Sequence, residues 1–533
     1  MKTSLQNVAE YLLEGKVRSR VALETLEGKY TYGDLHTAAT DVATYLLKVG
    51  AQKGDRALLV SENGFFWVAA YLGILKAGLV CVPLPPGISD QDLNQILEDA
   101  EAQVAFLQCN FAKKHKDKFR QITLITDKSS PITERVRKSF DLIQLHECVR
   151  VVPVGLSSTE TTATELAALM YTSGSTGIPH GVMVSHGNII ANTESIIGYL
   201  RLTESDRLMT VLPFHYCFGT SLLHTHLRAG GSLVVDHRFM YPEAVLQRMA
   251  ETECTGFAGV PAHFQTLLRK SSLRRRSFPC LRYVQQAGGQ LAPVFIRELK
   301  QALPGVEIFI MYGQTEATAR LSYLPPQMLE TKLGSVGKGI PGVKIQVVTQ
   351  NGAQVRPGEI GEIVAEGENV AIGYWREPQE TASRFRGGKL HTGDLATIDE
   401  DGFIYIVDRA RDFLKCGGER VSCRQVENQM QEFECLLEAS VLGIPDETWG
   451  EAVKAFLVAR MPGCPSFEGC FERFCKEHLV PKLRPKETVV LRSLPKNSSG
   501  KVIKRNLRDL TSKNCRLRAT VEHEPRGDSQ RTA

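Results

Sequence analysis

Short apolar runs alternate with helical hydrophobic patterns along the first part of the chain. The alternation predicts, in order, a helix over Tyr32–Val49, a strand over Arg56–Val60, a helix over Gly64–Ala77, a strand over Leu79–Leu84, a helix over Asp90–Ala100 and a strand over Ala102–Gln108. Strands that alternate with helices are typical of a parallel sheet with helices packed on its faces. The pattern therefore predicts an α/β fold.

The alternation continues well beyond this region. Further strands are predicted over Ala167–Tyr171, Asp206–Leu212, Gly231–Val235, Tyr283–Gln286 and Ile308–Tyr312. From about Gly334 to Ala365, short strands separated by Gly and Pro turns indicate a small β-rich subdomain. We expect a large N-terminal domain of several subdomains with parallel sheets.

A second unit is predicted after a short charged segment. A strand over Gly402–Asp408 is followed by residues 409–412, which are charged apart from one alanine, and a new unit begins at Phe413. We predict an N-terminal domain over 1–408, a hinge over 409–412 and a small mobile α+β domain over 413–511. The polar residues 512–533 are predicted to be a disordered tail.

Composition excludes several functional classes. The 533 residues contain 64 Lys and Arg against 59 Asp and Glu, so the net charge of +5 does not support nucleic-acid binding. The 13 cysteines lack paired spacing, which indicates reduced thiols and no zinc site. The longest apolar run, Phe65–Leu75, is too short to be a transmembrane segment, and no signal peptide is evident. A cytoplasmic protein is expected.

The strongest candidate for chemistry is the Gly-, Ser- and Thr-rich segment that follows the strand over Ala167–Tyr171. Its glycines let the backbone approach an anion closely, and its N–H and O–H groups can surround phosphate oxygens. The same composition is also typical of a flexible loop. The segment lacks the spacing of a Walker loop, and no G-x-G-x-x-G motif follows a strand. The candidate phosphate-binding residues are Thr172, Ser173, Gly174, Ser175, Thr176, Gly177 and His180.

This segment resembles the phosphate loop of the acyl-adenylate-forming superfamily, which includes acyl-CoA synthetases, adenylation domains of nonribosomal peptide synthesis and firefly luciferase. Further segments resemble the motifs of this superfamily in the expected order: Met311–Ala317, Leu390–Leu395, Val407–Arg420 and Pro495–Arg505. The motif style is closest to stand-alone acyl-CoA or acyl-carrier-protein ligases. The resemblance covers most of the chain.

The resemblance implies how ATP would be bound. It places Tyr312 and Gly313 against adenine, with Gly288 on the same side, and Asp394 on the ribose hydroxyls. It also places Thr315 at the α-phosphate and Glu316 on Mg²⁺, a hard cation that prefers carboxylate oxygen.

The resemblance also implies residues that act from the C-terminal part. Lys501 would be the lysine of the adenylation step, where a compact ammonium stabilises charge on the attacking carboxylate and the α-phosphate. Arg409 would contact the ribose or phosphates, and Gly417 and Gly418 would line the tunnel for the thiol arm.

Three positions depart from the usual motifs. His180 replaces the usual lysine of the phosphate loop, which predicts weaker ATP binding or some pH dependence. Asp408 stands where the family usually has glycine, and Arg411 stands at the pivot of the hinge. We expect these two changes to affect the rate of domain rotation more than the fold.

The acid-binding side is represented by Leu212–Gly219, which resembles the substrate motif of acyl- and aryl-CoA ligases. His215, Tyr216, Phe218 and Gly219 are its candidate substrate-binding residues, together with Gly288 and Gly289. Amino-acid-activating domains usually place an aspartate where this chain has Gly219. A cationic substrate would then lack its counter-charge, which argues against an α-amino acid.

The resemblance implies an ATP- and Mg²⁺-dependent carboxylic acid–thiol ligase of fatty acid metabolism. It would form an acyl-adenylate and then a thioester on CoA or on the pantetheine of a separate carrier protein. A fatty or other amine-free acid is the expected substrate. An amino-acid adenylation enzyme that loads a carrier protein is a second interpretation, and a catalytically silent relative with a binding role is a third.

Overall fold

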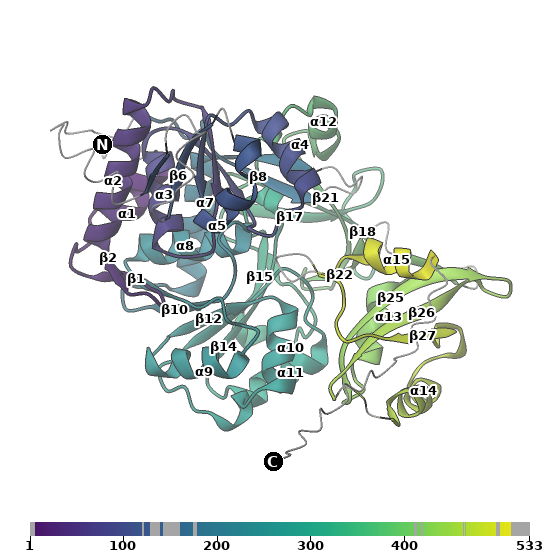
Figure 1. Ribbon diagram of the computed structural model, residues 1–533. Helices are drawn as coiled ribbons and strands as arrows, with labels where there is room; N and C mark the ends of the chain where they lie inside the picture. The colour runs from purple at the N-terminus through teal and green to yellow at the C-terminus, as the bar shows by residue number, and fades with distance from the viewer. Residues whose placement is uncertain are drawn as a thin grey trace, which may run out of the picture.

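The computed structural model describes residues 6–119, 122–127, 139–141, 160–173, 179–409, 413–416, 419–461, 463, 465–496 and 502–512. Three β-sheets with covering helices build a large N-terminal part, and a fourth sheet builds a smaller C-terminal part beside it (Figure 1). The predicted architecture of a large α/β unit and a small α+β unit is confirmed.

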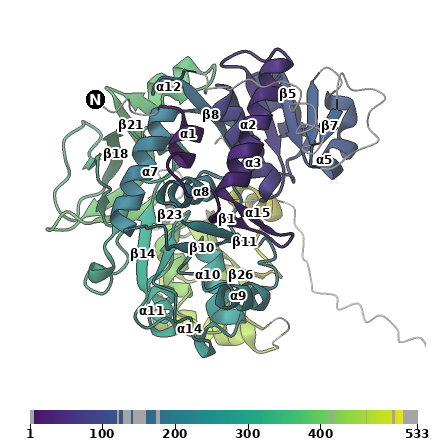
Figure 2. The same cartoon turned by 90° about the vertical axis from the view of Figure 1, so that its left-hand side faces the viewer.

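An eight-stranded sheet contains the first predicted elements. Its strands run in the order β19 (Gly373–Tyr374), β9 (Pro179–Ser185), β8 (Leu166–Ser173), β4 (Val80–Leu84), β3 (Arg56–Val60), β5 (Val104–Leu107), β6 (Thr123–Thr126) and β7 (Ser139–Asp141). The strands from β8 to β7 pair in parallel, whereas β8 and β9 form an antiparallel hairpin. The associated helices are α2 (Tyr32–Lys48), α3 (Phe65–Lys76), α4 (Asp90–Ala100) and α5 (Cys109–Lys114). Helices α2 and α3 lie side by side (Figure 2).

A nine-stranded sheet forms the second layer. Its order is β16 (Lys338–Gly339), β15 (Ser322–Leu324), β14 (Glu307–Tyr312), β13 (Tyr283–Gln286), β12 (Gly256–Gly259), β10 (Arg207–Thr210), β11 (Ser232–Val235), β1 (Val21–Glu24) and β2 (Lys29–Thr31). The helices are α1 (Val8–Leu13), α7 (His186–Leu200), α8 (Cys217–Ala229), α9 (Pro242–Glu251), α10 (Pro261–Lys270) and α11 (Pro293–Ala302). The predicted strand over Tyr283–Gln286 has the same bounds in the structure.

A five-stranded antiparallel sheet confirms the predicted β-rich subdomain and extends it to Arg409. Its strands are β17 (Val343–Val348), β18 (Gly361–Gly367), β21 (Lys389–Ile398), β20 (Phe385–Arg386) and β22 (Ile404–Arg409), with α12 (Pro378–Arg384) nearby. In β21 and β22, Asp394 pairs with Arg409 and Leu395 pairs with Asp408.

The C-terminal sheet has five strands: β23 (Phe413–Cys416), β24 (Glu419–Ser422), β25 (Leu436–Asp446), β26 (Gly450–Ala459) and β27 (Glu487–Val490). Its helices are α13 (Cys423–Met430), α14 (Phe467–His478) and α15 (Lys504–Ser512). Helix α15 thus includes Ser512, which was predicted to begin the tail, while 513–533 lie outside the described residues. The predicted hinge over 409–412 stays a prediction, because 410–412 also lie outside them.

The two parts are in contact through arginine side chains from both of them. Arg269 Nη1 donates to the Glu434 carbonyl at 2.6 Å, and Arg460 Nε donates to the Arg269 carbonyl at 3.1 Å. Arg297 forms an ion pair with Glu432 at 3.1 Å. These contacts hold α10 and α11 against the C-terminal sheet.

The hairpin of β14 and β15 contains a very close backbone approach near the predicted site. A Cβ added to Gly313 would lie 2.0 Å from the Ala319 carbonyl oxygen, which is closer than any real contact. Tyr312 O accepts a hydrogen bond from Leu321 N at 2.9 Å on the same hairpin. Only glycine therefore allows residues 313–319 to fold back on the end of β14.

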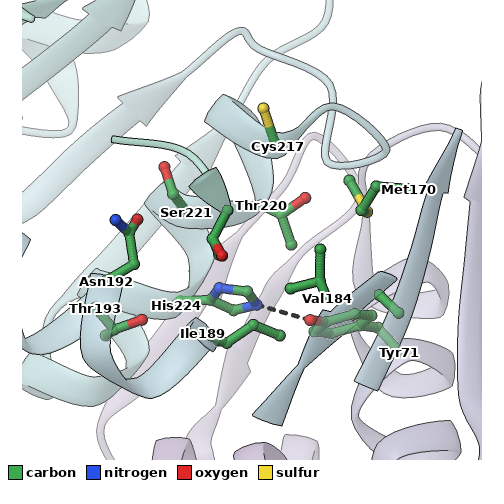
Figure 3. A pocket seen from close by; sticks show the side chains of 12 residues that line it. Tyr71, Met170, Val184, Ile189, Asn192, Thr193, Cys217, Thr220, Ser221 and His224 are labelled. Carbon is green, nitrogen blue, oxygen red and sulfur yellow. Dashed lines mark hydrogen bonds between the residues drawn. The ribbon is translucent and has the colours of Figure 1, made fainter. Parts of the chain in front are cut away.

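A small cavity lies behind this region, between α7, α8 and the β8–β9 hairpin (Figure 3). His224 on α8 points into it and is hydrogen-bonded through Nε2 to Tyr71 Oη at 2.8 Å. Burial lowers the pKa of His224 to about 3. The folded protein therefore holds this imidazole in its neutral form.

Replacement of Gly313 by Ala is expected to destabilise the fold. The new methyl group collides with the Ala319 carbonyl, and relief of such overpacking costs about 1–3 kcal/mol, or roughly 1–3 °C in the melting temperature of a chain of this length. Gly87→Ala is the matched control, because a Cβ at Gly87 meets no atom within 4 Å. Thermal unfolding followed by circular dichroism checks both variants, and equal melting temperatures would contradict the proposed constraint.

Acidification is expected to reduce stability partly through His224. Because its folded pKa of about 3 is below the usual histidine pKa of 6.5, the unfolded chain binds a proton first as the pH falls from about 6.5. At about pH 4.5 this difference removes roughly 2–3 kcal/mol of stability that is fully present at neutral pH. Urea unfolding at both pH values should show a smaller loss in His224→Gln than in the parent. An identical loss in both proteins would show that His224 does not contribute.

Candidate active site

The residues singled out from the sequence meet where the three N-terminal sheets adjoin. Tyr312 ends β14 of the nine-stranded sheet, Thr172 and His180 lie on the β8–β9 hairpin, and Asp394 lies on β21. Strands β10 to β14 run parallel, and Tyr312 is at the carboxyl end of this set. The carboxyl ends of parallel strands are the usual place for a ligand site in α/β sheets.

A direct hydrogen bond joins two of these sheets. Tyr312 Oη donates to Asp394 Oδ2 at 2.7 Å, and both side chains are buried. The pairing fixes the phenol ring of Tyr312 relative to the Asp394 carboxylate. The two positions predicted to contact adenine and ribose are therefore adjacent in the fold.

Glu316 is held by residues that the motifs did not reveal. Its backbone carbonyl accepts from Ala371 N at 2.9 Å, and its Oε1 accepts from Tyr374 Oη at 2.9 Å. Burial and the charge of Glu316 raise the pKa of Tyr374 well above its usual range, so this hydroxyl remains a donor. Tyr374 thus fixes the direction of the Glu316 carboxylate.

His180 belongs to the same polar cluster. It lies opposite Thr172 in the β8–β9 hairpin, and its Nδ1 donates to Glu377 Oε2 at 2.6 Å. Its ring lies 5.5 Å from the ring of Tyr374, centroid to centroid. His180, Glu377, Tyr374 and Glu316 therefore form a continuous series of contacts at the end of the predicted phosphate loop.

Several predicted residues cannot be placed. Gly174, Ser175, Thr176, Gly177, Gly417, Gly418 and Lys501 lie outside the described residues, and only the backbone is described for Ser173 and Arg409. Their roles stay predictions.

The acid-side motif adjoins Thr315 at the start of α8. Thr315 Oγ1 donates to Cys217 Sγ at 3.5 Å. Burial lowers the pKa of His215 to about 4, so its imidazole is neutral at physiological pH. A Cβ on Gly288 would lie 3.4 Å from Tyr216 Oη, which brings the predicted pocket glycine next to this motif.

Gly219 has a packing reason that the sequence did not reveal. A Cβ at this position would lie 2.0 Å from the Pro213 carbonyl oxygen. Its Cα therefore faces backbone and leaves no space for a side chain. Gly289 has its own neighbour, since a Cβ there would lie 3.2 Å from Pro261 Cγ.

A buried arginine was also missed by the sequence analysis. Arg320 follows the Glu316 motif, and its guanidinium carbon lies 4.0 Å above the centroid of the Phe218 ring. No family motif marked this position. Its only signal in the sequence is a charged residue two positions before β15 (Ser322–Leu324), next to the apolar Leu321.

The C-terminal part comes close to the site near α10. Lys496 and Val502, which flank the segment containing Lys501, pair with each other. Burial and the nearby charge of Lys496 lower the pKa of His263 to about 3. The two ends of the Lys501 segment are thus positioned beside the first turn of α10.

Asp408 bridges the two parts of the chain. Its Oδ2 accepts from Ser422 Oγ at 2.9 Å and from Arg424 N at 3.2 Å, at the start of α13. The side chain is buried. The departure from glycine at this position therefore places a carboxylate across the predicted hinge.

Within the described ranges, no cluster of three or more His, Cys, Asp or Glu side chains could hold a metal ion. No helix in those ranges has the length and apolar character needed to cross a membrane.

Comparisons with known proteins agree with the geometry. Residues 14–375 match the AMP-binding enzyme family, and residues 425–501 match the AMP-binding enzyme C-terminal domain. The chain is 29% identical over 508 residues to a long-chain-fatty-acid–CoA ligase of Salmonella typhimurium, covering 90% of each chain. It is also 29% identical over 495 residues to a 2-succinylbenzoate–CoA ligase of a Geobacillus species, covering 93% of this chain and 95% of that one.

A solved structure extends this similarity to three dimensions. The o-succinylbenzoate CoA synthetase of Bacillus subtilis, in complex with its acyl-adenylate intermediate, has a TM-score of 0.79, with 28% identity over 94% of this chain and 98% of that one. The chain belongs to the AMP-binding enzyme family, within the acyl-adenylate-forming superfamily, and is an AMP-forming ligase similar to acyl-CoA synthetases.

Proposed function

We propose that this enzyme joins a fatty or other amine-free carboxylic acid to the thiol of CoA or of a carrier-protein pantetheine. The proposal depends most on one observation: Tyr312, Glu316 and Asp394 converge at the junction of three sheets, each fixed by a contact from another segment. The two relatives described above act on a long-chain fatty acid and on 2-succinylbenzoate, which both lack an amine.

The polar atoms around the junction fit a nucleotide. Gln286 Oε1, Gln290 Oε1 and Gln314 Nε2 are buried without a hydrogen-bond partner in the described structure. A buried polar group without a partner costs about 1–3 kcal/mol, so such groups commonly serve a ligand. All three lie within or next to the predicted adenine-side segments, which supports ATP binding here.

The residues also fit a magnesium ion that is shared with the nucleotide. The Glu316 carboxylate is held by Tyr374, and carboxylate oxygen is a preferred ligand of Mg²⁺. Since no cluster of three protein ligands occurs among the described residues, phosphate oxygens would supply the other contacts. Bound Mg²⁺ would offset the phosphate charge during the first step.

In the proposed first step, a carboxylate oxygen of the acid attacks the α-phosphorus of ATP and pyrophosphate leaves. Thr315 and Lys501 would contact the oxygens that carry charge in this step. In the second step, the thiol attacks the acyl carbon and AMP leaves. The C-terminal part would rotate between the steps, removing Lys501 and bringing Gly417 and Gly418 to the site.

Carboxylate-dependent ATP–pyrophosphate exchange tests the first step. Across fatty, aryl and amino acids, exchange is expected with amine-free acids. Lys501→Ala should lower the exchange rate by about 10²–10³, the usual effect of removing one group that stabilises transition-state charge. Lys504→Ala is the control, because Lys504 lies nearby and forms an ion pair with Glu427 at 3.2 Å. Equal rates in both variants, or exchange with α-amino acids alone, would contradict the proposal.

Asp408 provides a test of the domain rotation. Its bonds to Ser422 and Arg424 hold the orientation in which Lys496 lies near His263. Asp408→Ala is expected to slow ATP–pyrophosphate exchange about tenfold, because a hydrogen bond to a charged group contributes about 1.5–3 kcal/mol. Thiol transfer from added acyl-adenylate should not slow.

The control for this variant is Asp399→Ala. Asp399 is paired with Lys332 at 2.8 Å inside the N-terminal part, so its loss does not affect the connection to α13. If Asp408→Ala slowed both half-reactions equally, the carboxylate would support the fold and not the orientation.

A further inference from the structure

Arg320 is a buried cation without an acidic partner. Only 1% of the residue is exposed, and no Asp or Glu among the described residues lies within ion-pair distance of its guanidinium. The other buried arginine among the described residues, Arg269, is paired with Glu298. A buried charge is normally paired, because its removal from water costs several kcal/mol.

The hydrogen bonds of the guanidinium are long and incomplete. Nε is 3.4 Å from Met311 Sδ, a weak acceptor, and Nη1 is 3.5 Å from the Ala319 carbonyl oxygen. Nη2 is buried and has no acceptor in the described structure. The Phe218 ring lies against one face of the guanidinium at 4.0 Å. The charge is therefore stabilised by an aromatic face and by the nearby Tyr199 hydroxyl, with no carboxylate partner among the described residues, and part of its donor capacity is unused.

The position of this cation connects the reacting end of the site to the acid-side motif. Arg320 comes four residues after Glu316, and its guanidinium lies on Phe218 of the motif. The neighbouring Cys217 accepts the hydrogen bond from Thr315. Arg320 thus lies beside Phe218 and Cys217, at the motif predicted to bind the acid.

The backbone of Arg320 is fixed from two sides. Its carbonyl accepts from Asn369 Nδ2 at 2.7 Å and from Asn192 Nδ2 at 3.2 Å. Thr318 has a φ of 65°, an uncommon value for a β-branched residue, and its Oγ1 donates to the Asn369 carbonyl at 2.7 Å. The surroundings hold a strained turn that presents Arg320, which is typical of a preorganised binding group.

We propose that Arg320 binds a second carboxylate of the substrate, so that the acid activated here is a dicarboxylic acid. This inference rests on the proposed function. A guanidinium presents parallel N–H donors that match a carboxylate, and the pair would supply the missing counter-charge. An unsubstituted fatty acid would bury more apolar surface around the cation and leave it unpaired. One carboxylate reacts with ATP while Arg320 holds the other.

The experiment measures ATP–pyrophosphate exchange with acids matched in length, from hexanoic and adipic acid to dodecanoic and dodecanedioic acid, and with benzoic and phthalic acid. The parent should prefer the diacid of at least one pair. Arg320→Met keeps an unbranched apolar stem and removes the charged guanidinium. It should lower kcat/KM for that diacid about a hundredfold, without the same loss for the monoacid, since loss of one partner of a buried charge pair leaves the other charge buried without its counter-ion.

Arg320→Lys tests the shape of the group separately from its charge. It should retain the preference for the diacid but with a higher KM, because lysine lacks the planar fork. Arg282→Met is the control, because Arg282 is paired with Asp206 at 2.7 Å and its loss should change stability without changing the preference.

The outcomes separate this inference from the proposed function. Equal losses for monoacid and diacid in Arg320→Met, with a lower melting temperature, would show that Arg320 only supports the fold. Exchange of the parent with monoacids alone would overturn the inference and leave the ligase function intact. Exchange with no acid at all would overturn both.

Discussion

The close approach of Gly313 to the Ala319 carbonyl is the constraint on which the site depends. It folds residues 313–319 back on the end of β14, so that one short turn presents groups in several directions. Tyr312 faces the third sheet and Glu316 faces β19, while Arg320 lies over Phe218. A side chain at position 313 would open this turn and separate all three.

Contacts from distant segments convert this turn into a rigid site. Tyr374 and Glu377 come from the region of β19 and α12, yet they position Glu316 and His180. The replacement of a lysine by His180 is accompanied by the Glu377 carboxylate at hydrogen-bond distance. The departure from the usual motif is therefore part of a local arrangement and is not an isolated change.

Local patterns predicted much of the fold because local physics decides it. The helix over Asp90–Ala100 and the strand over Arg56–Val60 have the predicted bounds, since periodicity and flanking polar residues mark their ends. Motif resemblance found Tyr312, Glu316 and Asp394. It could not find Tyr374 or Arg320, because their importance arises from tertiary contacts that no spacing in the sequence encodes.

Gly219 and Asp408 also have roles that depend on tertiary contacts and could not be predicted from the sequence. From the sequence, Gly219 indicates only that the aspartate that would pair with a cationic substrate is absent. The structure adds that the Pro213 carbonyl occupies the space that any side chain at this position would need. In the sequence, Asp408 differs from the glycine that is usual in the family. Only the fold shows the hydrogen bonds that its carboxylate accepts at the start of α13. Both residues connect segments that are separate in the sequence.

The central claim is that a carboxylate oxygen of the acid attacks the α-phosphorus of ATP at this junction. The most direct measurement uses an acid whose carboxylate carries heavy oxygen and determines by mass spectrometry where the label goes after complete turnover with ATP and a thiol. The account predicts one labelled oxygen in AMP and none in pyrophosphate. Label in inorganic phosphate, or AMP without label, would contradict it.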